Sequence, residues 1–204
     1  FPVGALPEMR RPAAAGLQFW AVVRTLLENC RNVQDALSML RDMPVAYNLN
    51  LILLDREGCC ALVETLDGRM AVKSIDRNSG EQALYATNHP VLDELIPHEP
   101  RAFVHSIRRY DNITAFLKQH GQDITDGQLK DFLLTPYPKG LSCSYYSQFF
   151  GTTKSMVMDP VRGSLSLCWG GRQENGWQDF NFDSPFPQGT ADIQIQDRTA
   201  DPSI

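Results

Sequence analysis

The chain has 204 residues, of which 43% are hydrophobic and 21% charged, with a formal net charge of −5. This length and composition suit a globular protein with a sizeable core. The negative charge and the lack of any Lys/Arg run argue against nucleic acid as a partner. Apolar runs such as residues 51–54 are far shorter than the roughly 20 residues of a membrane-spanning helix. We therefore expect neither nucleic acid nor membrane as a partner.

The chain has an odd number of cysteines, and their spacing matches no metal-binding motif: Cys30, Cys59, Cys60, Cys143 and Cys168. We expect reduced core thiols and, from them, a cytoplasmic protein. The histidines 89, 98 and 105 are the alternative metal set, but no HExxH motif and no paired cysteines accompany them. The sequence therefore predicts no metal and no cofactor.

The first helical pattern follows a Pro- and Gly-containing loop in residues 1–16. Apolar residues recur at helical spacing over 17–30 and predict an amphipathic helix. Asn32 with Asp35 approximates a capping box, so a second, shorter helix is expected to begin there. Pro44 lies just beyond its predicted end.

The next part of the chain changes to strand patterns separated by turn residues. Four strands of an antiparallel meander are predicted, with one strand of the first hairpin buried on both faces: 48–55, 59–66, 69–76 and 82–87. The Asp67-Gly68 pair is a strong hairpin signal. The fourth strand would end at Asn88.

The second half of the chain predicts two more helices and a late group of strands. One helix is expected over 101–119, and Thr125 with Gln128 matches a capping box for the next. A hairpin is predicted from 152–158 and 164–169, with a further short strand near Phe180 and Phe182.

Strands in blocks and helices in pairs favour layers over alternating βα units. We therefore predict an α+β fold of the αββα sandwich type. It would form a single domain over residues 1–186, followed by a flexible polar tail at 187–204.

The stretch that matters most for function is residues 85–90, which ends in Asn88-His89-Pro90. Pro90 disfavours the α region for His89, so this dipeptide should be extended or in a turn. The side-chain NH2 of Asn88 could then donate to an oxygen that becomes negative in a transition state. The alternative is a surface turn, for which Asn and Pro are ordinary residues.

Other candidate residues carry two interpretations each. His89 either moves protons and contacts a leaving group, or orients Asn88 as a loop residue. Tyr145, Tyr146 and Phe149 either line an acyl pocket or cover the core. Arg108 and Arg109 fit the solvated edge of a helix better than a substrate clamp.

Five segments, in order, resemble the N-terminal-nucleophile hydrolases of the isopenicillin N acyltransferase type: 26–37, 48–55, 87–89, 106–110 and 155–163. This family is related to the choloylglycine hydrolases, which include bile salt hydrolases and penicillin V acylases. The resemblance implies the αββα sandwich, in agreement with the layered order of elements. It extends from Gly16 to about Phe182.

The resemblance also implies an activity, namely hydrolysis or acyl transfer at a linear amide C–N bond through a cysteine thioester. In such enzymes the cysteine becomes N-terminal when the precursor cleaves itself, and its own α-amino group acts as the base. The substrate would be a small acyl amide or acyl thioester. Asn88 matches the family residue whose side chain helps form the oxyanion hole.

The chain departs from the family pattern at its beginning. Phe1 has no nucleophilic side chain, and none of the five cysteines lies where the family nucleophile would. We therefore expect an upstream segment of the same precursor to supply the nucleophile and the first strands of the sandwich. A catalytically inactive member acting as a binding or structural protein is the alternative, and a homo-oligomer is left open.

Overall fold

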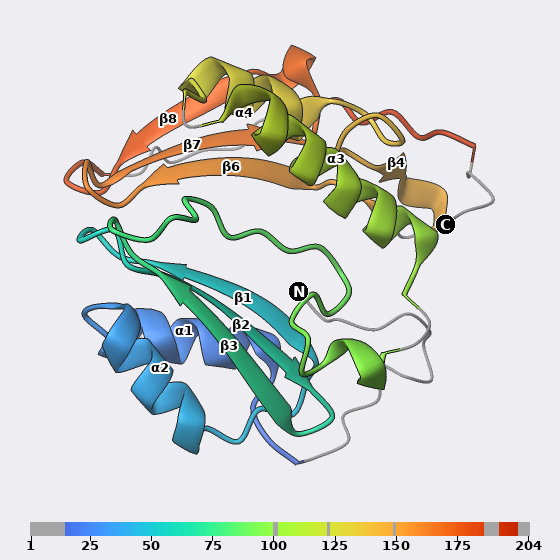
Figure 1. The fold of residues 1–204 in the computed structure, drawn as a ribbon. Helices are drawn as coiled ribbons and strands as arrows, with labels where there is room; N and C mark the ends of the chain where they lie inside the picture. The colour runs from blue at the N-terminus through green and yellow to red at the C-terminus, as the bar shows by residue number, and fades with distance from the viewer. Residues whose placement is uncertain (1–14, 100–101, 122, 149, 186–191, 200–204) are drawn as a thin grey trace. The chain divides into compact units, whose positions relative to one another are not determined.

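The computed structural model describes residues 15–99, 102–121, 123–148, 150–185 and 192–199 (Figure 1). The chain divides into two compact units, Phe1–Tyr110 and Asp111–Ile204. The boundary between them falls within the long helix α3 (Val104–His120). Whether the chain is a single domain, as the sequence predicts, stays a prediction.

The first unit begins with the two predicted helices, α1 (Phe19–Asn29) and α2 (Val33–Asp42). The Oδ1 of Asn32 accepts a hydrogen bond from the Asp35 backbone N–H at 2.8 Å, which satisfies a free donor at the start of α2. The expected N-cap is therefore confirmed. Both helices bury their apolar stripes: Val22 and Leu26 in α1, and Val33, Ala36, Leu37 and Leu40 in α2.

Three antiparallel strands follow, in the order β1 (Leu49–Leu54), β2 (Cys60–Leu66) and β3 (Arg69–Ile75). Asp67 and Gly68 both have positive φ angles, of 49° and 79°, as expected for the tight turn between β2 and β3. One face of the sheet packs against α1 and α2 (Figure 1). The core residues on that face are Leu49, Leu51, Ala61 and Val63.

The opposite face of this sheet is covered by an irregular segment that ends in the short 3-10 helix η2 (Ile96–His98) (Figure 1). Leu62 and Leu66 of β2 pack there against Leu92 and Leu95. Strand β2 is therefore buried on both faces, as the sequence predicts.

The prediction of a fourth strand is wrong, because residues 82–87 form no strand. Leu84 and Ala86 belong to the short apolar run 83–86, which imitates a strand pattern. Both side chains instead pack onto the apolar cluster on the face of the sheet. The segment thus crosses over the sheet and does not pair with its edge.

The second unit contains the end of α3 and the helix α4 (Asp126–Leu134). Thr125 and Gln128 form the predicted capping box, each side chain bonding to the backbone of the other residue. The rings of Phe116 and Phe132 stack with centroids 4.2 Å apart and join α3 to α4.

The main sheet of the second unit has the order β6 (Lys154–Asp159), β7 (Ser164–Trp169) and β8 (Trp177–Asn181). These strands confirm the predicted late hairpin and the predicted strand at Phe180, whereas Phe182 lies beyond β8 and is exposed. A two-stranded pair, β4 (Ser144–Tyr145) and β5 (Phe150–Gly151), flanks the 3-10 helix η3 (Tyr146–Gln148). Helix α4 packs against β6.

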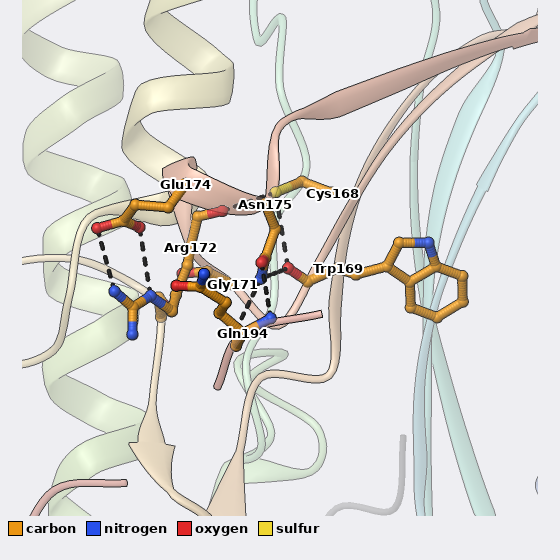
Figure 2. Close-up of polar contacts among 8 residues, drawn as sticks. Cys168, Trp169, Gly171, Arg172, Glu174, Asn175 and Gln194 are labelled. Atoms are coloured by element: carbon orange, nitrogen blue, oxygen red, sulfur yellow. Dashed lines mark hydrogen bonds and ion pairs between the residues drawn. The ribbon is translucent and has the colours of Figure 1, made fainter. Parts of the chain in front are cut away.

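The turn that leads into β8 contains the 3-10 helix η4 (Gln173–Asn175) and binds a distant part of the chain. Figure 2 shows Asn175 beside Gln194, where their groups exchange two hydrogen bonds of 2.8 and 2.9 Å. This contact anchors the exposed, irregular residues 192–199, which belong to the predicted tail 187–204. The flexibility of that tail stays a prediction, and its residues 187–191 and 200–204 lie outside the described part.

The mixture of helices and antiparallel sheets confirms the α+β class. The five cysteines all lie in the described part of the chain and form no disulfide. Within that part, no helix combines the length and apolar character needed to cross a membrane.

Candidate active site around Asn88

The side chain of Asn88 is partly buried and has a defined orientation. Its Oδ1 accepts a 2.6 Å hydrogen bond from a terminal nitrogen of Arg109. Because a guanidinium group only donates, the amide atom facing Arg109 must be the oxygen. The Nδ2 group consequently points away from Arg109, and it donates to no other atom of the described residues. Asn88 thus presents an NH2 group with a fixed direction.

The backbone of Asn88 is held by the buried Ser106 near the start of α3. The Asn88 N–H donates to the Ser106 Oγ at 2.7 Å, and the Thr87 hydroxyl donates to the Ser106 carbonyl at 2.9 Å. Ser106 is fully buried, so these bonds are shielded from water. They fix the residues on which the amide side chain depends.

His89 is anchored through one of its two ring nitrogens. Its Nδ1 lies 2.8 Å from the Ser106 Oγ and 3.1 Å from the Thr87 Oγ1. Its ring also meets Tyr110 edge-to-face, with centroids 5.5 Å apart. These contacts agree with the interpretation that His89 orients the Asn88 segment. A direct catalytic role for His89 stays a prediction.

The ring of Tyr110 packs beside His89 and carries no charge at neutral pH. Burial is the main cause, and a hydrogen bond with Tyr85 the second, of the rise in the pKa of Tyr110 to about 12. The two tyrosine rings lie with centroids 4.7 Å apart. At neutral pH the phenol therefore keeps its proton and can act as a donor but not as a base.

The sheet face beneath the loop also contacts it through Asn50 of β1. The Asn50 Nδ2 donates to the carbonyl oxygens of Thr87 and His89, at 3.0 Å each. These two carbonyls lie immediately before and after Asn88. A single amide group thus binds the backbone on both sides of the candidate residue.

Glu64 of β2 binds the next part of the same loop. Its carboxyl oxygens accept hydrogen bonds from the Val91 N–H at 2.8 Å and the Leu92 N–H at 3.0 Å. The side chain is almost fully buried, and this burial raises the pKa of Glu64 although the two N–H donors act in the opposite direction. Glu64 is a buried acceptor dedicated to this turn.

The sequence interpretation of the two arginines is only half correct. Arg108 is exposed, as expected for the solvated edge of a helix. Arg109 is partly buried and contacts Asn88, so the same interpretation is wrong for Arg109. Sequence reasoning also missed Ser106, which lies three residues earlier and therefore on the same face of α3 as Arg109. The three-residue spacing of Ser106 and Arg109 was the sequence signal that could have identified Ser106.

The aromatic candidates lie in the second unit. Tyr145 is buried in a cluster with Tyr137 and Cys143, and the Tyr146 hydroxyl donates to the Thr152 carbonyl at 2.6 Å. These contacts tie both rings into the fold, and their part in an acyl pocket stays a prediction. Phe149 lies outside the described residues. Over the described ranges, no three His, Cys, Asp or Glu side chains are grouped so as to hold a metal ion.

The Asn88 NH2 group, whose direction is fixed by Arg109, is a hydrogen-bond donor of the kind that can stabilise a negative acyl oxygen. Residues 5–174 match the family model described as acyl-coenzyme A:6-aminopenicillanic acid acyl-transferase. The match covers most of the chain, and the chain therefore belongs to this family. Its membership confirms the resemblance to the isopenicillin N acyltransferase type and indicates acyltransferase or hydrolase activity. The comparison with curated proteins gave no match.

Proposed function

We propose that this chain is the larger part of an αββα enzyme that hydrolyses or transfers acyl groups at linear amide bonds. The nucleophile is an N-terminal cysteine in an upstream segment of the same precursor, exposed by self-cleavage. The substrate is a small acyl amide or acyl thioester. Family membership supports the reaction class, and the geometry of Asn88 supports the role of this chain in it.

The observation that carries the proposal is the direction of the Asn88 amide. Attack on an acyl carbon places negative charge on the carbonyl oxygen, and a donor already aimed at that oxygen lowers the barrier without reorganising. Arg109 holds the Oδ1 of Asn88, which leaves the Nδ2 to donate. The positive charge of Arg109 also polarises the amide and strengthens the Nδ2 group as a donor.

The chemical steps follow from an N-terminal thiol. The cysteine α-amino group, whose ordinary pKa is about 8, takes the thiol proton, and the thiolate attacks the amide carbon. A C–S bond forms, the C–N bond breaks, and the amine leaves with the proton held by the ammonium group. Water or a second amine then attacks the thioester, releasing the acid or a new amide and restoring the thiol. Asn88 serves both steps, because each passes through an oxyanion.

The test uses the full-length protein that contains this chain. Mass spectrometry should detect loss of an upstream segment and a new N-terminal cysteine. An intact N-terminus, or a first residue without a nucleophilic side chain, would instead favour a binding or structural role. Hydrolysis of a short-chain acyl amide or thioester then provides the rate assay.

Asn88→Ala should lower turnover by about a hundredfold to a thousandfold, the usual cost of one oxyanion donor. Asn78→Ala is the matched control, because Asn78 is an exposed asparagine in an ordinary turn of the same unit. Asn78→Ala should leave the free energy of unfolding within about 0.5 kcal/mol of the parent, as surface changes do. Asn88→Ala should lower it by about 1.5–3 kcal/mol, because it removes the acceptor of the Arg109 hydrogen bond, and the variant should still fold. Equal rates for the two variants would show that Asn88 is a turn residue only.

A further inference from the structure

Two polar residues lie directly opposite one another on the face of the first sheet that packs against Leu92 and Leu95. Asn50 of β1 and Glu64 of β2 are register partners, so their side chains emerge side by side on one face. The buried residues of β2 and β3 that share this face are Leu62, Leu66 and Ala71. Burying an amide and a carboxyl group among apolar side chains is costly unless both groups are hydrogen-bonded.

The hydrogen bonds of this pair all go to the loop that contains Asn88. Asn50 supplies donors to the carbonyls of Thr87 and His89, and Glu64 supplies acceptors to the N–H groups of residues 91 and 92. The chemistry of each side chain matches the backbone groups that it meets. Together the pair holds the loop on both sides of Pro90.

We infer that Asn50 and Glu64 are positioning residues that set the location of Asn88 for catalysis. This inference rests on the proposed function of Asn88. Neither side chain touches the Asn88 amide, so they act through the backbone that carries it. A displacement of about 1 Å in such a group can reduce turnover by about a hundredfold.

The Oδ1 of Asn50 supports a specialised role for this residue. The atom is buried and accepts no hydrogen bond from the residues that the structure describes. A buried acceptor without a partner is unfavourable, and an apolar residue at this position would avoid the problem. Asn50 is therefore used here for its NH2 group, which bridges two carbonyls.

Asn48, the residue immediately before β1, provides a matched control. It precedes Asn50 by two residues and is buried. Its Oδ1 accepts a hydrogen bond from the Asp67 N–H at 2.9 Å, in the hairpin turn between β2 and β3. It therefore makes a similar side-chain-to-backbone bond that does not involve the Asn88 loop.

The experiment compares Asn50→Ala with Asn48→Ala in the full-length protein. Both variants should be less stable than the parent in urea. Asn50→Ala should lower kcat by between about tenfold and a hundredfold with KM nearly unchanged. Asn48→Ala should keep kcat within about twofold of the parent, because changes at independent sites do not couple. Equal losses of kcat in the two variants would overturn the inference.

Asn50→Asp gives a second test that keeps the shape of the side chain. At neutral pH the introduced carboxylate faces two carbonyl oxygens and repels them. When protonated, the same group can donate one hydrogen bond, so its activity relative to the parent should rise as the pH falls. A ratio that does not change with pH would contradict the role of the NH2 donor.

The outcomes separate this inference from the function on which it rests. If Asn88→Ala retains full activity, the proposed function fails. If Asn88→Ala is impaired but Asn50→Ala is not, only the positioning role fails. Hydrogen exchange at the N–H groups of Val91 and Leu92 is a readout besides activity, and Glu64→Gln should accelerate it.

Discussion

Replacing Arg109 by methionine tests whether the guanidinium group directs the Asn88 amide. The 2.6 Å bond to Oδ1 is short and charge-assisted, and methionine keeps the length of the stem without the donors. Without Arg109, the amide can turn over and exchange its oxygen and nitrogen positions. The NH2 group would then point toward the place of the former guanidinium for part of the time.

The size of the effect follows from the strength of this bond. A hydrogen bond to a charged group contributes about 1.5–3 kcal/mol. At about 1.36 kcal/mol per tenfold change in rate, the expected loss of kcat is about 13-fold to 160-fold. KM should change little, because the bond orients a donor that acts mainly in the transition state.

The assay is turnover of a short-chain acyl amide by the processed protein, with urea unfolding measured in parallel. Arg108→Met is the control, since Arg108 is the exposed neighbour on the same helix. Some loss of stability is expected only in Arg109→Met, because Arg109 also donates to the His105 carbonyl at 3.3 Å. The reasoning is refuted if both variants turn over substrate at the same rate.

Two further predictions concern stability. Burial raises the folded-state pKa of Glu64, so its contribution to stability is complete below the unfolded pKa of about 4.3 and is lost as the pH rises through the raised value. Urea midpoints should therefore fall less between about pH 4 and about pH 8 in Glu64→Gln than in the parent. Parallel curves for the two proteins would contradict this assignment. Thr125→Ala removes the acceptor for the Gln128 N–H and should lower the free energy of unfolding by about 1 kcal/mol, measured by urea denaturation. An unchanged midpoint would show that the cap at α4 does not contribute.

Local features of this fold could be predicted well from the sequence. Asn32 and Thr125 were identified as helix caps, and both make the expected bond to the backbone three residues later. The Asp67-Gly68 turn has the positive φ angles that its composition demands. Each of these features depends on neighbours within a few residues, so the sequence pattern contains the whole interaction.

The candidate site could be predicted only in part, because its contacts join distant residues. Asn88 was identified from its local sequence and the family resemblance. Its partner Arg109 lies 21 residues away, and Asn50, which binds the adjoining carbonyls, lies 38 residues away. Spacing along the chain contains no signal for such pairs. The same limit explains the error at 82–87, where a short apolar run fits both a strand and a segment packed on a sheet.

That error has a consequence for how the site can be altered. In an edge strand, the backbone groups around Asn88 would bond to neighbouring backbone, and no single side chain would control their position. In the structure, the side chains of Asn50 and Glu64 take these backbone groups instead. Single substitutions can therefore move the loop while the ladder of β1, β2 and β3 stays intact. This is why loss of turnover and loss of folding should be separable at Asn50, which an edge strand would not allow.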